Sequence, residues 1–447
     1  MSRYKPYPVY KDSGVEWIGE VPEHWERWKM AHAFSRIGSG TTPTASEREW
    51  YEGGTVNWVT TGELREGVIY DTEAKVTFEA IKRFSALRIH PAGSVVIAMY
   101  GATIGRLGVL GEDSTTNQAC CVLSGSIAIS QKFAFYWLLA SKKAIIDLFA
   151  SGGAQPNINM EKVAELRVPC PSVQEQTQIA DYLDGHCDRI DALIAKKSRF
   201  VELLREKRQA FITHAVTKGL DPSVKMKDSG VEWLGEVPEH WGRRRIKFSV
   251  AASRNGVWGD DPTGINDIPC VRVADFNRQT LRVNASIPTL RAVPERDRLG
   301  RLVRRNNLLL EKSGGGEKQS VGQVVIYDRD DEAVCSNFIA RVVLAPSENA
   351  FFWCYLFAGA YACGAHMRSI KQTSGIQNLD QEQYFNEIAP HPSLEEQQAI
   401  ASAIDRETSR IDALITKTQR SIDLLKERRS AFITAAVTGQ INLRESK

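Results

Sequence analysis

Apolar residues recur at heptad spacing along residues 171–219 of this chain. No proline interrupts the stretch after its first residue, and Ser172 with Glu175 matches the S-x-x-E capping box of a helix start. The stripe lies on two neighbouring heptad positions and contains Leu183, Ile190, Leu193, Leu204 and Phe211. The pattern predicts one helix on the order of 65 Å long, far longer than most helices of globular domains.

The same pattern recurs 221 residues later, along residues 392–439, where Ser393 and Glu396 repeat the cap. Its stripe contains Ile404, Ile411, Leu414, Leu425 and Phe432. We expect these apolar residues to pack the two helices against each other, antiparallel around a pseudo-twofold axis. The alternative is that each helix is buried separately on a globular body. Polar positions in the stripe, such as His186 and Lys197, either set the register or lie at a solvated rim.

A short motif repeats as well. Residues 11–27 read KDSGVEWIGEVPEHWER, and residues 227–243 differ from them at only two of 17 positions. The chain therefore runs motif, variable region, long helix, and then the same three again. A period of this size indicates duplication of a whole unit, because the repeats of solenoid proteins are much shorter. His24 and His240 belong to the motif, so a structural role is favoured over a catalytic one.

The two variable regions predict mixed α/β domains with the same outline and little shared sequence. Strands are expected near residues 55–60, 94–100 and 106–110, and near 269–274, 307–311 and 323–327, with an apolar helix at 133–150 and at 351–363. A polar turn closes each region, at 151–158 and 374–379. The fold class is α+β: two mixed α/β domains separated by a pair of long antiparallel helices.

Composition narrows the class of protein only slightly. The net charge is +3, and the eight cysteines show no C-x-x-C spacing, which favours free buried thiols over zinc or disulfides. We find no membrane span and no signal peptide, so we expect a cytoplasmic protein without a membrane partner. Nucleotide-loop, zinc-protease and hydrolase motifs are absent, and the glycine-rich SGGGEK at 313–318 lacks the Gly-Lys-Ser/Thr ending. This favours a binding subunit, with no catalytic residue and no metal ligand assigned.

Two different globular domains at the ends of a helical spacer suggest a protein that reads an extended target at two places. Duplex DNA, with a helical repeat of about 34 Å, is the obvious target. Two alternatives remain: an endonuclease with an unrecognised active site, and a helical scaffold that binds other proteins.

Several motifs, in the same order twice, resemble the DNA-specificity subunits of type I restriction-modification systems. The carrying segments are PSVQEQ at 171–176 and PSLEEQ at 392–397, RQAFIT at 208–213 and RSAFIT at 429–434, GSVVIA at 93–98 with GATIG at 101–105, TNQA at 116–119, QPNI at 155–158, and QNL at 377–379. The start WIGEVPEHW is also like that family. Region two departs from the pattern, because NLLL with SGGG replaces the GATIG turn and SNF at 336–338 replaces TNQ.

The resemblance implies target recognition domains at 1–168 and 221–389 that each read one half of a split DNA site. The helices at 169–220 and 390–447 would set the spacer and dock two methyltransferase subunits, which restriction/translocase subunits then join. S-adenosylmethionine, ATP and Mg²⁺ are expected on those partner subunits, and no cofactor on this chain.

Base reading requires polar loop side chains that reach base edges. In region one the candidates are Thr41, Thr42, Thr60, Thr61, Tyr100, Thr103, Arg106 and Gln155. In region two they are Arg254, Asn255, Arg272, Lys312, Lys318, Gln319, Lys371 and Gln372. Asn117 and Gln118 are either structural or part of the same surface.

Overall fold

The computed structural model describes residues 4–15, 17–44, 46–149, 157–265, 267–316, 319–373 and 375–444. Contacts divide the chain into two compact units. Unit 1 consists of residues 1–197 and 420–447, and unit 2 consists of residues 198–419. Each unit therefore contains one variable region, the first half of the helix that follows it, and the second half of the other long helix.

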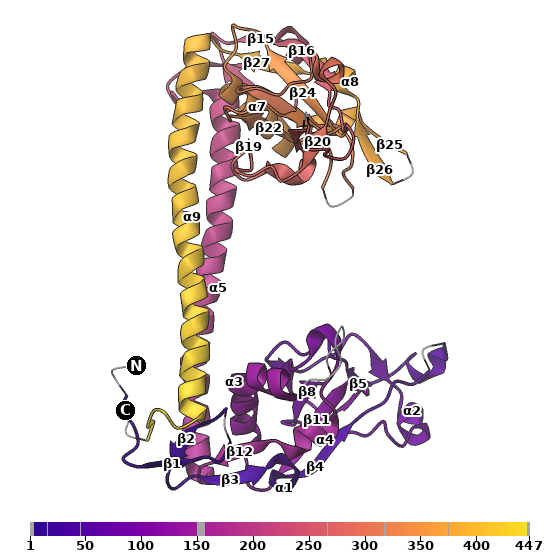
Figure 1. The fold of residues 1–447 in the computed structure, drawn as a ribbon, viewed down its shortest axis with the longest axis vertical. Coiled ribbons are helices and arrows are strands. Elements are labelled where there is room, and N and C mark those ends of the chain that lie inside the picture. Colours follow the sequence, from indigo (N-terminus) through magenta and orange to yellow (C-terminus); the bar gives the residue numbers. More distant parts are fainter. Residues whose placement is uncertain are drawn as a thin grey trace. The chain divides into compact units, whose positions relative to one another are not determined.

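Both predicted long helices are present (Figure 1). Helix α5 spans Val173–Lys218 with 46 residues, and α9 spans Leu394–Val437 with 44 residues. A glycine with positive φ closely follows the end of each helix, Gly219 at 76° and Gly439 at 73°, the conformation that commonly terminates helices. The Ser172 and Ser393 hydroxyls accept hydrogen bonds from the Glu175 and Glu396 backbone N–H groups at 3.3 and 3.2 Å, as the caps predicted.

The two helices run antiparallel within each unit. In unit 1 the Phe432 ring lies 4.1 Å from the His186 ring, and Arg429 pairs with Asp191 at 3.1 Å. In unit 2 Arg208 pairs with Asp412 at 3.1 Å, and Gly219 lies beside Glu396. The two ion pairs join equivalent residues of the repeat, because 208 and 191 plus 221 give 429 and 412. The predicted antiparallel pair is therefore confirmed.

Most of the stripe packs as predicted, but two leucines do not. Leu183, Ile190, Leu204, Ile404, Ile411 and Phe432 are buried, and Phe211 and Leu425 are partly buried. Leu193 is 47% exposed and Leu414 is 41% exposed, so the prediction that they pack the pair is wrong. Two helices share only one seam, and at Leu193 and Leu414 the second apolar position of the stripe lies outside it.

The capping box forms only in part, because the Glu175 carboxylate is used elsewhere. This side chain accepts hydrogen bonds from Tyr7 Oη at 2.7 Å and Trp25 Nε1 at 3.3 Å, and lies 2.9 Å from His24 Nε2. Glu396 likewise contacts His240 and Trp241 in unit 2. The repeated motif thus closes the start of each long helix, which confirms the structural role predicted for the two histidines.

The two variable regions have the same sheet topology. In unit 1 a five-stranded sheet has the order β4-β11-β8-β9-β6, and a second sheet has the order β10-β5-β7. These strands are β4 Phe34–Ser39, β5 Val56–Val59, β6 Val68–Ile69, β7 Lys75–Val76, β8 Val95–Ala98, β9 Leu107–Leu110, β10 Ser114–Thr116 and β11 Cys120–Ser126.

Unit 2 repeats this arrangement as β16-β24-β21-β22-β19, extended by β18, with a second sheet β20-β17-β23. The parallel strand pairs of the two units also correspond. Strand β5 pairs with β10 as β17 pairs with β23, and β6 pairs with β9 as β19 pairs with β22. The strands are β16 Val250–Asn255, β17 Asp267–Val271, β18 Phe276–Asn277, β19 Arg282–Val283, β20 Leu290–Ala292, β21 Asn307–Glu311, β22 Val324–Tyr327, β23 Val334–Cys335 and β24 Ile339–Leu344.

An apolar helix covers each large sheet, α3 at Gln131–Phe149 and α7 at Ala350–Ala362, as the pattern predicted. Each core joins this helix to both long helices: Phe133 and Trp137 share the unit 1 core with Ile179 and Phe432. Phe352 and Trp353 share the unit 2 core with Ile212 and Ile400.

Smaller elements complete each unit. They are α1 Met30–Ala33, α2 Phe78–Arg83 and α4 Met160–Glu165 in unit 1, and α6 Glu295–Arg298 and α8 Gln381–Phe385 in unit 2. Strands β3 Glu26–Lys29 and β12 Arg167–Cys170 pair in unit 1, as β15 Gly242–Arg245 and β27 Ile388–His391 do in unit 2.

The predicted closing turns differ from the structure in region two. Residues 376–379 form strand β26 (Ile376–Leu379), which pairs with β25 (Ile370–Thr373), so a turn there is wrong. The sequence did not reveal this strand because both faces of the hairpin carry polar residues. The alternation of apolar and polar positions that marks a strand is therefore absent. The turn predicted at 151–158 lies largely outside the described residues.

Candidate nucleic-acid interface

In unit 1 the predicted DNA-reading loops meet at one set of strand ends. The Thr41 carbonyl accepts from Trp58 Nε1 at 3.1 Å, and Thr42 Oγ1 donates to Gln118 Oε1 at 2.5 Å. The Asn117 N–H donates to the Val59 carbonyl at 3.0 Å, directly before Thr60. Three chain segments that are distant in sequence therefore lie together.

The turn after β8 belongs to the same edge. Met99 N–H donates to the Ala119 carbonyl at 2.8 Å, and Tyr100 bridges to Asn157. Residues 101–103 form a short 3₁₀ turn, in which Thr103 Oγ1 donates to the Tyr100 carbonyl. Tyr100 is 43% exposed and Arg106 is exposed, so both side chains are accessible to a ligand.

Thr60 has a local partner, and Thr61 is half-buried beside it. The Thr60 N–H donates to Glu63 Oε2 at 2.6 Å and its hydroxyl lies 3.2 Å from the same oxygen. In unit 2 the equivalent position is Arg272, whose N–H donates to Asp275 Oδ2 at 2.8 Å. The same hydrogen bond, from a backbone N–H to an acidic side chain three residues later, forms in both domains. The residue that donates it is a threonine in one domain and an arginine in the other.

Two glycines mark a further equivalence. A Cβ on Gly40 would lie 1.6 Å from the Thr116 carbonyl oxygen, and one on Gly256 would lie 2.0 Å from the Cys335 carbonyl oxygen. Ser336 N–H donates to the Val271 carbonyl at 2.9 Å, as Asn117 N–H does to Val59. Ser336 is thus the counterpart of Asn117, which shifts by one position the correspondence suggested by sequence.

In unit 2 the glycine loop after β21 pairs with the β25–β26 hairpin. The Lys312 carbonyl accepts from Leu379 N–H at 2.8 Å, and Gly314 N–H donates to the Gln377 carbonyl at 3.1 Å. Gln372 lies opposite Gln377 in this hairpin and is exposed. Lys371 pairs with Asp380 at 2.7 Å, and this hydrogen bond raises the pKa of the lysine.

A hollow of about 600 Å³ lies beside that loop. Two predicted residues, Arg272 and Gln319, line it together with Trp258, Arg278, Glu311 and Phe338. Arg278 Nη2 donates to the buried Glu311 carboxylate at 3.0 Å, and burial raises the pKa of Glu311 although Arg278 opposes this. The Gln319 side-chain oxygen, in the orientation that satisfies its neighbours, accepts from Arg278 Nε at 2.7 Å.

Sequence reasoning missed Trp258, Arg278 and Phe338. Trp258 is 39% exposed and Phe338 is 47% exposed, and the Arg291 guanidinium lies 4.6 Å from the Trp258 ring centroid. The only sequence signal for Trp258 is its place between Gly256 and Gly259, since an aromatic residue in a glycine-bounded loop has little core to join.

The remaining candidates lie apart or outside the description. Arg254 and Asn255 are exposed on β16, an edge strand, and Asn255 Oδ1 accepts from Gln381 Nε2 at 3.2 Å. Gln155 and Lys318 lie outside the described residues. Contact between any of these side chains and DNA stays a prediction.

The surface offers hydrogen-bonding, cationic and aromatic groups. Within the described ranges, no group of three or more His, Cys, Asp or Glu side chains is placed to hold a metal ion. Seven of the eight free thiols are buried, and burial raises the pKa of Cys120 and Cys121 to about 12. Among the described helices, none combines the length and apolar character needed to cross a bilayer.

Comparison with known proteins shows which family the chain resembles. Residues 22–203 match the family model described as type I restriction modification DNA specificity domain. The specificity subunit of the type I restriction enzyme MjaIX of Methanocaldococcus jannaschii is 22% identical over 450 residues, which covers 96% of both chains.

Over nearly its whole length the chain is similar to the specificity subunits of type I restriction-modification systems.

Two other specificity subunits match, one over nearly the whole chain and one over about half of it. That of MjaVIII, from the same organism, is 22% identical over 438 residues and covers 95% of this chain and 94% of the relative. That of EcoR124I/EcoR124II from Escherichia coli is 24% identical over 215 residues, 47% of this chain and 51% of the relative.

Solved structures share the fold of this chain. A chain from a study of complex assembly and conformational transition of the type I R-M system superposes with a TM-score of 0.70 at 14% identity, covering 93% of this chain and 98% of that one. The HsdS subunit from Thermoanaerobacter tengcongensis superposes with a TM-score of 0.50 at 15% identity, covering 94% and 98%.

Proposed function

We propose that this chain is the non-catalytic DNA-recognition subunit of a type I restriction-modification complex, and that each target recognition domain reads one half of a bipartite, asymmetric site. The observation that best supports this proposal is that both units use the same sheet topology with different loop side chains. Both units place loops at the same strand ends, yet Thr42 and Thr60 of unit 1 correspond to Trp258 and Arg272 of unit 2. Duplicated scaffolds with divergent reading surfaces suit two different half-sites.

The chemistry of the two surfaces supports different base preferences. Hydroxyl and amide groups, as in Thr42 with Gln118, both donate and accept hydrogen bonds, whereas Arg272 only donates. Arginine favours the acceptor pair of guanine in the major groove. We therefore assign the predicted side chains to base and phosphate contacts within their own domain.

The long helices are proposed to set the spacer between the half-sites and to dock methyltransferase subunits. Leu193 and Leu203 on α5 are 47% and 45% exposed, and their equivalents Leu414 and Leu424 on α9 are 41% and 55% exposed. These leucines are identical in both copies, yet they do not pack the helix pair. Exposed apolar residues retained twice suit a surface that partner subunits cover.

The remaining parts of the proposal concern other subunits. Methylation with S-adenosylmethionine and ATP-driven cleavage with Mg²⁺ are assigned to two methyltransferase subunits and to restriction/translocase subunits. We propose a cytoplasmic location, because the proposed ligand is the DNA of the cell.

Genome-wide mapping of methylated bases tests the proposal. The system is expressed with its methyltransferase subunits, with and without this chain. We expect methylation at a split motif with a fixed spacer that disappears when the chain is omitted. A contiguous motif, or an unchanged motif without the chain, would contradict the proposed function.

A further inference from the structure

The hollow of unit 2 contains a buried charge that the shared scaffold does not require. Glu311, the last residue of β21, is 3% exposed and lines this hollow of about 600 Å³. In the strand register Glu311 lies opposite Ile339 of β24. Ala98 has the same place in unit 1, opposite Cys120 of β11, and is fully buried in an apolar cluster. The scaffold therefore accepts an apolar residue at this position, and unit 2 has a carboxylate there instead.

The partner of this carboxylate is also particular to unit 2. Arg278 Nη2 donates to Glu311 Oε2 at 3.0 Å. Arg278 lies in the segment 272–283, whose 12 residues take the place of the 10 residues 60–69 in unit 1. Burying an ion pair costs desolvation energy that apolar residues avoid. Such a departure from the economical solution, made in only one of two matched domains, is typical of a functional site.

One oxygen of the Glu311 carboxylate is left for a ligand. Within the part of unit 2 that the structure describes, Arg278 is the only donor to this carboxylate, and it bonds Oε2 and leaves Oε1 without a hydrogen bond. Arg278 is held in turn by Gln319, whose side-chain oxygen accepts from Nε at 2.7 Å and from Nη1 at 2.8 Å. A buried acceptor without a donor is costly. The hollow therefore presents an open acceptor beside a fixed cation.

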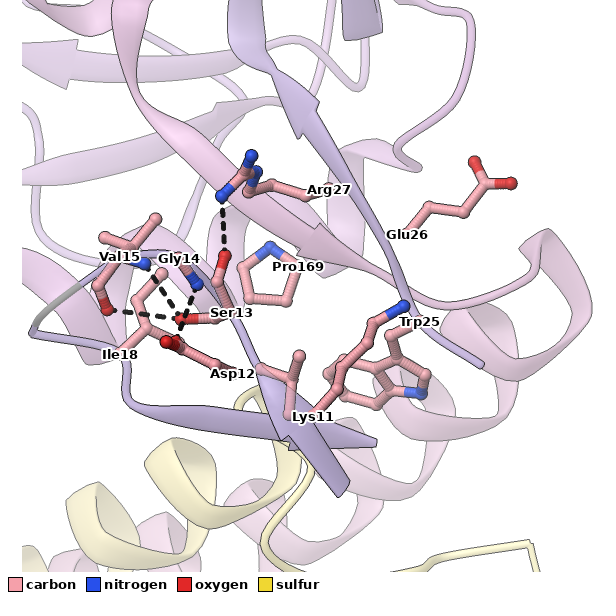
Figure 2. A pocket seen from close by; sticks show the side chains of 11 residues that line it. Lys11, Asp12, Ser13, Gly14, Val15, Ile18, Trp25, Glu26, Arg27 and Pro169 are labelled. Atoms are coloured by element: carbon pink, nitrogen blue, oxygen red, sulfur yellow. Dashed lines mark hydrogen bonds between the residues drawn. The ribbon is translucent and has the colours of Figure 1, made fainter. Parts of the chain in front are cut away.

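The hollow at the repeated motif of unit 1 differs in this respect (Figure 2). Its volume is about 320 Å³, and it adjoins strands β1 (Tyr10–Asp12) and β2 (Glu20–Pro22). The side chains of Asp12, Ser13 and Arg27 line it, and each bonds to a backbone group of the motif at 2.8 to 3.2 Å. We assign no ligand there, because the fold itself uses these polar groups.

Two exposed aromatic rings, Trp258 and Phe338, also line the hollow of unit 2. Their counterparts in unit 1 are Thr42, two residues after the matched glycine, and Ala119, which the backbone hydrogen bonds after β8 and β21 match with Phe338. Arg291 lies against the Trp258 ring and donates to the Trp258 carbonyl at 3.2 Å, so the ring is held in place. Aromatic rings presented in this way stack on nucleobases.

The shape of the hollow decides the kind of ligand. The major groove of DNA is about 8.5 Å deep, so the edges of paired bases are recessed in the duplex as Glu311 is recessed in the protein. A base that leaves the stack can enter the hollow. Its faces then meet aromatic rings, and its Watson–Crick edge carries both N–H donors and acceptors. A phosphate group does not fit, because the Glu311 carboxylate repels it.

We propose that the hollow lined by Trp258, Arg278, Glu311, Gln319 and Phe338 is a pocket for one unpaired nucleobase of the half-site that unit 2 reads. Glu311 Oε1 accepts a hydrogen bond from the base edge, Arg278 donates one beside it, and the two aromatic rings contact the base faces. The base that becomes methylated is not this ligand, because methyltransferases take their target base into their own pocket. The inference rests on the proposed function, since it requires DNA bound at unit 2.

Binding of modified duplexes to the complete complex with methyltransferase subunits tests the pocket. Each duplex carries the mapped split site with one abasic residue, placed in turn opposite every base. Loss of the pairing partner lowers the cost of extruding a base, so we expect about tenfold tighter binding at one position away from the methylated bases. Trp258→Ala and Glu311→Gln should each remove this gain. Trp258→Phe keeps a stacking ring and should retain it.

Two controls accompany these variants. Phe248→Ala removes a ring of unit 2 that is 63% exposed and lies outside the hollow, and it should leave the gain unchanged. Any gain at the methylated bases comes from the partner subunits and should persist in every variant. Thermal unfolding midpoints within about 2 °C of the parent establish that the variants fold. Because Trp258 is exposed, its variants keep the test available if Glu311→Gln does not fold.

The possible outcomes separate the pocket from the proposed function. No gain in the parent away from the methylated bases, or a gain that survives in folded Trp258→Ala, would overturn the pocket while preference for the split site remains. Fewer methyltransferase subunits on the variants without DNA, measured by native mass spectrometry, would overturn it in favour of a protein side chain in the hollow. A parent complex without preference for the split site would instead contradict the proposed function.

Discussion

Glu175 shows how one buried side chain ties separate parts of unit 1 together. It is 4% exposed and joins the start of α5 to Tyr7, His24 and Trp25. Its equivalent Glu396 makes the same contacts with His240 and Trp241, but its side chain is 28% exposed. The same carboxylate therefore has a stronger structural role in unit 1.

Glu175→Ala should destabilise unit 1 by about 3 kcal/mol, because it leaves buried donors of Tyr7 and Trp25 without an acceptor. Glu396→Ala is the matched control and should cost about 1 kcal/mol, since water reaches the equivalent site. Denaturant unfolding of both variants measures the difference. Equal losses would show that burial does not set the contribution of this carboxylate.

Buried histidines make the protein sensitive to acid. Burial, assisted by Arg36 and Arg88, lowers the pKa of His90 to about 4, and burial lowers that of His366 to about 4. In the unfolded chain a histidine titrates near 6.5. The unfolded state therefore takes up protons first, and stability is lost as the pH falls from about 6.5 to about 4.

His90→Leu should remove about 2 kcal/mol of the destabilisation seen at pH 5 relative to pH 7.5. The comparison is made within each variant across pH, so any packing change common to both conditions cancels. Unfolding midpoints of the parent and of the variant at the two pH values measure it. An unchanged pH dependence would mean that His90 becomes protonated in the folded state.

At the scale of elements, the matched glycines fix how close the strand ends approach. Gly40 follows β4 and Gly256 follows β16, and each lies against the carbonyl group of the last residue of β10 or β23. A side chain there must displace backbone rather than another side chain. The site loops depend on this approach, because Thr41, Thr42 and Trp258 follow directly.

Gly40→Ala and Gly256→Ala should each destabilise their unit by about 3 kcal/mol or more. The added methyl group would overlap a backbone carbonyl group, and the overlap is relieved only if the backbone moves. Gly67→Ala is the control: a Cβ at Gly67 meets nothing within 4 Å, and its cost should stay below about 1 kcal/mol. Thermal unfolding compares the three variants. A Gly40→Ala protein as stable as Gly67→Ala would contradict the close approach.

At the scale of the whole molecule, duplication joins the two units through shared helices. Each unit uses the start of one long helix and the end of the other in its core. Neither half of the sequence therefore completes its own core without the other half. This interlocking is the reason that the compact units differ from the sequence segments.

Inserting one heptad after Lys197 in α5 and one after Gln419 in α9 lengthens both helices at the border between the units. Seven residues add about 10.5 Å of helix and preserve the heptad phase. We expect the preferred spacer to grow by about 3 base pairs while both half-sites stay the same. Methylation mapping reads both features, and altered half-sites with an unchanged spacer would refute the spacer role. The same insertion in α5 alone is the control and should impair assembly.

Sequence periodicity determined the long helices and the apolar helix of each domain, because heptad and 3.6-residue spacing are local properties. The antiparallel pairing of the long helices was predicted from the duplication. Periodicity misplaced Leu193 and Leu414, since spacing shows a stripe but not which side of it a partner covers. It also missed the β25–β26 hairpin, in which polar residues occupy both faces.

By itself, the sequence determined that this protein is a duplicated unit with two different surfaces. A residue-by-residue comparison of the two halves shows which segments repeat and which diverge. Only the tertiary structure decided which loops share a surface. Thr42 meets Gln118, and Arg272 and Gln319 line one hollow with Trp258 and Phe338. Such neighbours come from strand pairing between distant segments, and no local pattern encodes that pairing. Short-range periodicity can be read directly from a sequence. The register between distant strands is selected only when the whole domain packs.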